Sequence, residues 1–268
     1  MASDDSPDLS SAIVSVHLIC VDSRDNHNKF WEGYVLPDGV LYAKYGRVNY
    51  RGQTHAYSCG SVAKAQTKLQ QLVREKRSKG YAEVELDRAS NQTLNFSVLG
   101  ERAENIKAQI RQLEMDAEII HQHTIIRFDP EKGQYRTSLG ILTVQTIERA
   151  ERLLDQIVYA QGSRNRTTLI QAIEAYLRLI PMPIGMSLNP EALLGKYTQV
   201  ENQRAAIQAL REGIEEINQI RDQIKVTIAA NQNANQNERS FWLSWGESDS
   251  VEVETAFEDS RSDCVSWS

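Results

Sequence analysis

The stretch VLYAKYGRVNYRGQTHAYSCGSVAKAQTKLQQLVREKRSKG, residues 40–80, contains the change of hydrophobic period that decides the fold of the N-terminal region. Its first half alternates apolar and polar residues and is rich in β-branched and aromatic side chains, which predicts strands at 40–48 and 54–59. Over 61–79 the apolar residues recur every three or four positions instead, and Gly80 follows as a helix terminator. The stretch therefore predicts a small sheet with one amphipathic helix packed on it.

Segments on either side extend this sheet. Residues 14–21 and 30–36 alternate in the same way, and residues 81–86 read as a closing strand. The predicted domain spans residues 11–88, and the acidic, polar residues 1–10 before it are expected to be disordered.

The rest of the chain predicts helices and then a tail. After a linker at residues 89–98, apolar stripes at helical spacing predict an all-α bundle over residues 99–229, so the fold class is α+β. Residues 230–268 are Asn/Gln-rich and then acidic and Ser-rich, which predicts a disordered low-complexity tail. The stripes of the first, second, third and last helices are Ile106, Ile110, Leu113, Ala117 and Ile120; Ile147, Ala150, Leu154 and Ile157; Leu169, Ile173 and Leu177; and Ile207, Leu210, Ile214, Ile217, Ile224 and Ile228.

Charge is distributed unevenly along a chain whose net charge is −6. Between Val40 and Gly80 the only acidic residue is Glu75, whereas the charged residues after Asn231 are mostly acidic. A basic module inside an acidic chain is typical of a phosphate-contacting surface, although a solvated basic helix would look the same. The cations of the module are Lys44, Arg47, Arg51, Lys64, Lys68, Arg74, Lys76, Arg77 and Lys79.

The tripeptide Tyr45-Gly46-Arg47 suggests how such a surface would act. An aromatic ring stacks on a sugar or an exposed base, a glycine allows close backbone approach, and an arginine clamps a phosphate. The tripeptide follows an aromatic strand and precedes a Gly-containing loop and a basic helix.

This whole arrangement resembles the WGR domain of the DNA-dependent poly(ADP-ribose) polymerases, whose Trp-Gly-Arg appears here as Tyr45-Gly46-Arg47. The resemblance implies binding of a DNA end or nick near a 5′ phosphate, with Tyr45 stacking and Arg47 contacting phosphate or bridging to a helical domain. Gly46 completes the motif, and Lys44, Arg51, Lys64 and Lys68 would supply salt-dependent attraction to the DNA.

The helical region resembles the regulatory domain that follows WGR in those polymerases. The matching stretches are Ser138-Leu139-Gly140-Ile141-Leu142-Thr143 and Leu179-Ile180-Pro181-Met182-Pro183-Ile184-Gly185. The family's catalytic ADP-ribosyltransferase domain, with its NAD-binding His-Tyr-Glu set, is expected to be absent, since no histidine follows Ala229. We therefore predict a protein that is not an enzyme.

Other chemistry has little support in the sequence. His121 and His123 are spaced i, i+2, which suits a helical metal site poorly, so neither metal nor cofactor is expected. The three scattered cysteines argue against a disulfide framework and favour an intracellular location: cytoplasm or nucleoid in a bacterium, nucleus in a eukaryote. No segment predicts a membrane span.

Two functions remain open at this point. The first is a non-catalytic nucleic-acid-binding and regulatory protein that senses DNA ends or nicks in a DNA damage response. The second is a regulatory subunit that binds a separate ADP-ribosyltransferase or another protein effector, with the acidic residues after 231 masking the basic face until the partner displaces them.

Overall fold

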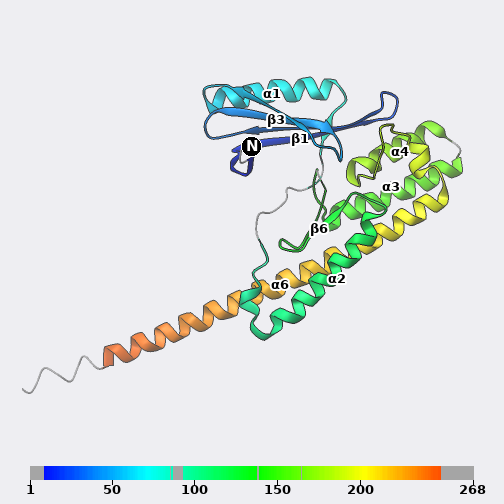
Figure 1. Cartoon of the computed structure of the whole chain (residues 1–268). Coiled ribbons are helices and arrows are strands. Elements are labelled where there is room, and N and C mark those ends of the chain that lie inside the picture. Colours follow the sequence, from blue (N-terminus) through cyan, green and yellow to red (C-terminus); the bar gives the residue numbers. More distant parts are fainter. Residues whose placement is uncertain (1–8, 85, 87–92, 138, 164, 249–268) are drawn as a thin grey trace, which may run out of the picture.

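The computed structural model describes residues 9–84, 86, 93–137, 139–163 and 165–248 of the 268-residue chain. Figure 1 shows two parts, a sheet with one helix lying along it and a group of longer helices on the other side of the sheet. None of the helices within the described residues is long and apolar enough to cross a membrane.

The N-terminal part is an antiparallel sheet of five strands in the order β4-β3-β2-β1-β5. Every predicted strand and the predicted helix are confirmed, although the closing strand is only two residues long because only that short run pairs with β1. A short 3-10 helix, η1 (Leu9–Ser11), precedes the sheet. The elements are β1 (Val14–Asp22), β2 (His27–Val35), β3 (Val40–Arg47), β4 (Gln53–Ser58), α1 (Val62–Ser78) and β5 (Ala82–Glu83).

Helix α1 packs closely on one face of this sheet. The Ser61 hydroxyl caps its first turn by accepting a hydrogen bond from the Lys64 N–H at 3.3 Å. Gly33 lets the helix approach, because a Cβ at this position would lie 2.5 Å from Cδ1 of Leu69. Alternate strand residues and one stripe of α1 form the shared core of Leu18, Trp31, Val35, Leu41, Ala43, Ala65, Leu69 and Val73.

The second part is mostly helical. The apolar stripes predicted for its helices are largely buried, since they pack against one another and against the sheet. Its elements are η2 (Phe96–Arg102), α2 (Ala103–His121), α3 (Val144–Ser163), α4 (Arg166–Leu179), α5 (Pro190–Leu194) and α6 (Tyr197–Ser248).

Two local expectations for this part were wrong. It also contains a small antiparallel sheet of β6 (Arg127–Asp129), β7 (Gln134–Thr137) and β8 (Gly140–Ile141), so it is not purely helical. The last helix was expected to end near Ala229, yet α6 continues through the Asn/Gln-rich stretch to Ser248. A formed helix propagates at little cost, and residues 230–245 contain neither proline nor glycine to end it.

Parts of all five predicted segments lie outside the described residues. These are residues 1–8 of the N-terminal segment, 85 and 87–88 of the sheet-and-helix domain, 89–92 of the linker, 138 and 164 of the helical region, and 249–268 of the tail.

The sheet and the helices share a core. Ile19, Val21 and Phe30, on the face of the sheet away from α1, belong to the same buried cluster as residues of α3, α4 and α6. The sheet therefore lies between α1 and the helical part (Figure 1).

Candidate nucleic-acid interface

Residues Lys44, Tyr45 and Gly46 lie at the end of β3, and the strand pleat sends them to alternate faces. Tyr45 follows the buried Leu41 and Ala43 on the α1 face of the sheet, where its side chain is 38% exposed. Lys44 lies on the opposite face. The predicted stacking residue is thus accessible, but the predicted cation next to it is not on the same surface.

The register of β4 adds two rings to the Tyr45 face. His55 pairs with Ala43 and Tyr57 with Leu41, so both side chains share the face of Tyr45. The two rings contact each other edge to face, with centroids 4.5 Å apart. Tyr57 lies about 14 Å from Tyr45 along the strands, at about 3.4 Å per residue.

Two cations of α1 complete this surface. The Lys68 ammonium lies 5.7 Å from the centroid of the Tyr57 ring, and Lys64 is exposed one turn earlier. We call Tyr45, His55, Tyr57, Lys64 and Lys68 the Tyr45 surface. His55 and Tyr57 were not predicted as site residues, although the period-two pattern of strand 54–59 already placed them on one face.

The loop between β3 and β4 holds Arg51 next to this end of the sheet. Gly46 and Gly52 pack against each other: a Cβ at Gly46 would lie 3.0 Å from the Gly52 Cα, and one at Gly52 would lie 2.7 Å from the ring of Phe30. The glycine of the motif is therefore needed for the close approach of two backbone segments. Two residues of the loop between these glycines are exposed to solvent: Tyr50, by 48%, and Arg51.

Arg47 is directed toward the helical part. Its guanidinium donates to the Gly185 carbonyl at 3.1 Å, and to the backbone and side-chain oxygens of Asn26 at 3.4 Å each. Asn26 in turn accepts from the Leu188 N–H at 2.7 Å and donates to the Met186 carbonyl at 2.9 Å. Arg47 is the centre of a contact between the two parts, which we call the Arg47 bridge (Arg47, Asn26, Gly185, Met186 and Leu188).

Helix α4 holds the same end of the sheet. The Ser23 N–H donates to a Glu174 carboxylate oxygen at 2.7 Å, and Arg178 donates to the Val21 carbonyl at 3.3 Å. The turn between β1 and β2 is therefore fixed to the helices from two sides.

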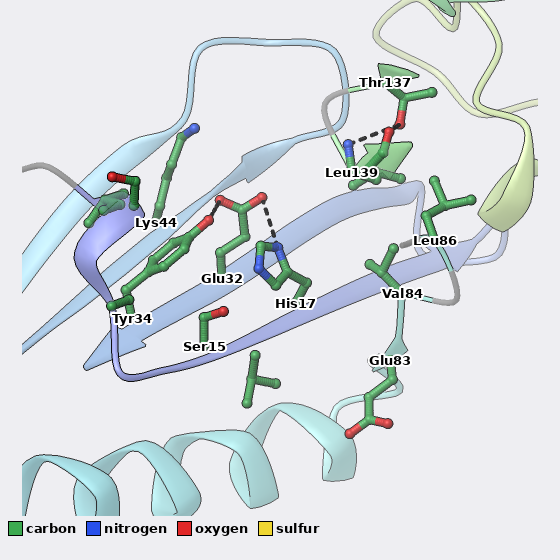
Figure 2. A pocket seen from close by; sticks show the side chains of 15 residues that line it. Ser15, His17, Glu32, Tyr34, Lys44, Glu83, Val84, Leu86, Thr137 and Leu139 are labelled. Carbon is green, nitrogen blue, oxygen red and sulfur yellow. Dashed lines mark hydrogen bonds and ion pairs between the residues drawn. The ribbon is translucent and has the colours of Figure 1, made fainter. Parts of the chain in front are cut away.

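Lys44 lines a pocket of about 530 Å³ between the sheet and the residues Thr137, Leu139 and Gly140. Figure 2 shows Tyr34 and His17 pointing at Glu32 from the same face of the sheet. The Tyr34 hydroxyl donates to Glu32 at 2.9 Å, and the His17 Nδ1 lies 3.6 Å from the other carboxylate oxygen. The Lys44 ammonium lies 5.9 Å over the Phe30 ring. The structure therefore separates Lys44 from the other predicted cations.

Electrostatics favour the Tyr45 surface as a phosphate site. Residues 14–88 contain twelve Lys and Arg against eight Asp and Glu, a net charge of +4 within a chain of −6. At the end of α1, Arg77 pairs with Glu83 and Lys79 with Glu75. Among the described residues, no carboxylate lies within ion-pair distance of Lys64, Lys68 or Arg51.

The α1 terminus differs from this surface. The pKa of the Lys76 ammonium is below its ordinary value, mainly because the side chain is partly buried, and it lies 5.5 Å over the Tyr81 ring.

Within the part of the chain that the structure describes, no group of three or more His, Cys, Asp and Glu side chains is placed to hold a metal ion.

Comparison with known proteins gives one family. The family model described as "WGR domain" matches residues 14–88, which include the whole sheet and α1. No curated protein matches the chain. A Bacteroides fragilis protein solved by a structural genomics consortium is 23% identical over 38% of this chain and 30% of its own length, with a TM-score of 0.25. Residues 14–88 of this chain therefore form a WGR domain, a nucleic-acid-binding domain found in poly(ADP-ribose) polymerase-like and other regulatory proteins.

Proposed function

We propose that this chain is a non-catalytic regulatory protein that binds DNA at ends or nicks through the Tyr45 surface and Arg51. The observation that carries the proposal is the exposed Tyr45 ring, which shares one face of a basic WGR domain with two more rings and with two cations that have no carboxylate partner among the described residues. Rings interleaved with cations are typical of surfaces that bind nucleic acid with exposed bases.

A preference for breaks follows from the chemistry of this surface. Stacking on Tyr45 needs a sugar or base whose face is free, and an intact duplex offers such faces only at an end or a nick. Lys64, Lys68 and Arg51 would contact phosphates, which supply affinity but carry no sequence information. The protein would therefore recognise the structure of the DNA and not its sequence.

Regulation would pass through the Arg47 bridge. Arg47 follows Tyr45 by two residues, yet its guanidinium binds the Gly185 carbonyl in the helical part. DNA bound at Tyr45 would therefore contact the end of β3, two residues before the arginine that binds the helical part. In this proposal Arg47 bridges the two parts and does not serve as the main phosphate ligand, and the helical part acts as a regulatory domain of the polymerase type.

The test is fluorescence anisotropy with a nicked, 5′-phosphorylated duplex. Tyr45→Ala is expected to weaken binding by about 5- to 150-fold, since stacking on an aromatic ring contributes about 1–3 kcal/mol per base. Lys64→Ala with Lys68→Ala should lower the dependence of log affinity on log salt by about 2. Lys107→Ala, which removes an exposed cation of α2, is the matched control. Affinities for both test variants equal to that of the control would contradict the proposal.

A second candidate function is docking of a separate protein effector. It is favoured by α6, whose final turns run away from the other elements in Figure 1. An effector docked there would be captured equally by the wild type and by Tyr45→Ala, and would be lost when the chain is cut after Val226. Loss of capture by Tyr45→Ala would exclude this candidate.

A further inference from the structure

A groove between α2 and α6 has no role in the function proposed above. It has a volume of about 400 Å³ and lies between two helices that run side by side in the helical part (Figure 1). Residues of α2 form one wall and residues of α6 the other, and Tyr135 of β7 contributes its ring.

The groove is acidic. Asp116 of α2 and Glu212 and Glu216 of α6 all line it. Asp116 accepts a hydrogen bond from the Gln112 side-chain amide of α2 at 2.9 Å, and Glu212 accepts one from the Gln208 side-chain amide of α6 at 2.8 Å. Among the residues that the structure describes, no Lys or Arg lies within ion-pair distance of these three carboxylates. No Lys or Arg side chain in the described part of the chain therefore neutralises their negative charges.

An unpaired hydroxyl group lies at the same place. Tyr135 is 1% exposed, and its hydroxyl has no hydrogen-bond partner among the described residues. The hydroxyl reaches α6 at Gly213, where an added Cβ would lie 2.2 Å from the oxygen. Gly213 also lines the groove. A glycine inside a helix is usually unfavourable by about 1 kcal/mol. Here it makes room for the Tyr135 hydroxyl, a buried polar group without a hydrogen-bond partner among the described residues.

The carboxylates around the groove influence the pKa of the Tyr135 hydroxyl. Burial raises the pKa of Tyr135 above its ordinary value, and the carboxylates of Asp116 and Glu216 raise it further. The phenol therefore stays neutral at physiological pH, and its oxygen remains able to accept a hydrogen bond from a donor that enters the groove.

The rest of the lining is mostly aliphatic, with His123 and Asn202 as its polar members. Ile119 is 61% exposed at the rim, and Ala205, Ala206 and Ala209 of α6 face the same space. Small alanine side chains leave room beside α6 for an unbranched hydrocarbon chain.

We propose that this groove binds an alkylammonium group, with the ammonium between Asp116 and Glu216, the Tyr135 oxygen as a third acceptor, and the methylene chain against Ile119 and the alanines. An ammonium has three donors and one positive charge, which match three acceptors in an acidic site. The same chemistry occurs in a free polyamine and in the lysine side chain of a protein partner, and the experiment distinguishes these two sources.

Isothermal titration calorimetry on the full chain tests the proposal with three probes: spermidine, Nα-acetyl-lysine methylamide, and the same compound acetylated at Nε. The wild type is expected to bind at least one of the two amines with a stoichiometry of one, and not to bind the Nε-acetylated compound. Binding of spermidine alone identifies a free polyamine, and binding of the lysine derivative alone identifies a lysine side chain.

Variants locate the site. Asp116→Asn and Glu216→Gln should each weaken binding by about 10-fold or more, as expected for loss of a charged hydrogen-bond partner. Tyr135→Phe keeps the buried ring, so its fold can be checked by its unfolding midpoint, and it should weaken binding by several-fold. Glu215→Gln is the matched control, because Glu215 is exposed on α6 beside Glu216 but does not line the groove. Equal losses for Glu215→Gln and Glu216→Gln, undiminished binding by Tyr135→Phe, or no binding of either amine at millimolar concentration would overturn the proposal.

Discussion

Replacement of Arg47 by alanine should open the contact between the WGR domain and the helical part. The change removes the 3.1 Å hydrogen bond to the Gly185 carbonyl and two longer ones, at 3.4 Å, to Asn26. A hydrogen bond from a charged donor contributes about 1.5–3 kcal/mol, and the two longer bonds add little. We therefore expect the contact to lose about 2 kcal/mol, which makes its opening about 30-fold more frequent.

Hydrogen exchange measures this opening directly. The Leu188 N–H donates to the Asn26 side chain at 2.7 Å across the contact, so its exchange should accelerate by about 30-fold in Arg47→Ala. The Ile125 N–H donates to Pro181 within the helical part and should keep its rate.

The matched control is Arg51→Ala, which removes an exposed cation of the neighbouring loop. It should leave the exchange of Leu188 unchanged. An unchanged Leu188 rate in Arg47→Ala, or equal acceleration of Leu188 and Ile125, would refute the idea that Arg47 holds the two parts together.

Three further predictions concern the domain and the tail. Gly46→Ala should destabilise the fold by about 1–3 kcal/mol, measured as a lower thermal midpoint, because the added methyl group meets the Gly52 Cα at 3.0 Å. Hydrogen bonds from Arg24 lower the pKa of Asp22 from 3.8 to about 2, so this pair stabilises the fold above pH 4 and the contribution is lost as the pH falls toward 2. Urea midpoints between about pH 2 and pH 5 should therefore fall more for the wild type than for Asp22→Asn, by a small amount because Arg24 is largely exposed to solvent. Deletion of residues 231–268 should raise nucleic-acid affinity at low salt if their acidic side chains compete for the basic face, and an unchanged affinity would exclude that role.

Strong hydrophobic periods made most of the fold predictable. The strands around Tyr45 alternate cleanly, and the stripe of α1 repeats over 17 residues, so both periods were visible in the sequence. Strands β6, β7 and β8 contain three, four and two residues, which are too few to show a period. The length of α6 was not predicted, because an Asn/Gln-rich composition is typical of disorder. A helix that has already formed nevertheless continues through such a stretch at little cost.

The candidate site was predictable only in part. Alternation along β3 already implied that Lys44 and Tyr45 face opposite sides, and it also implied the positions of His55 and Tyr57. The partner of Arg47 was not visible in the same way, because the Gly185 carbonyl lies 138 residues away in the chain and is a backbone atom. Such a contact depends on how the two parts pack, which no local pattern encodes.

The most direct test of the account is the binding of the wild type to a nicked, 5′-phosphorylated duplex, with an intact closed circle as competitor and at two salt concentrations. If Lys64, Lys68 and Arg51 each neutralise one phosphate, affinity should fall about 40-fold when salt rises from about 50 to about 200 mM. The nicked duplex should retain the protein against an excess of the circle. Binding that is insensitive to salt, equal for the nick and the circle, or absent at low salt would contradict the proposal that this WGR domain recognises DNA breaks.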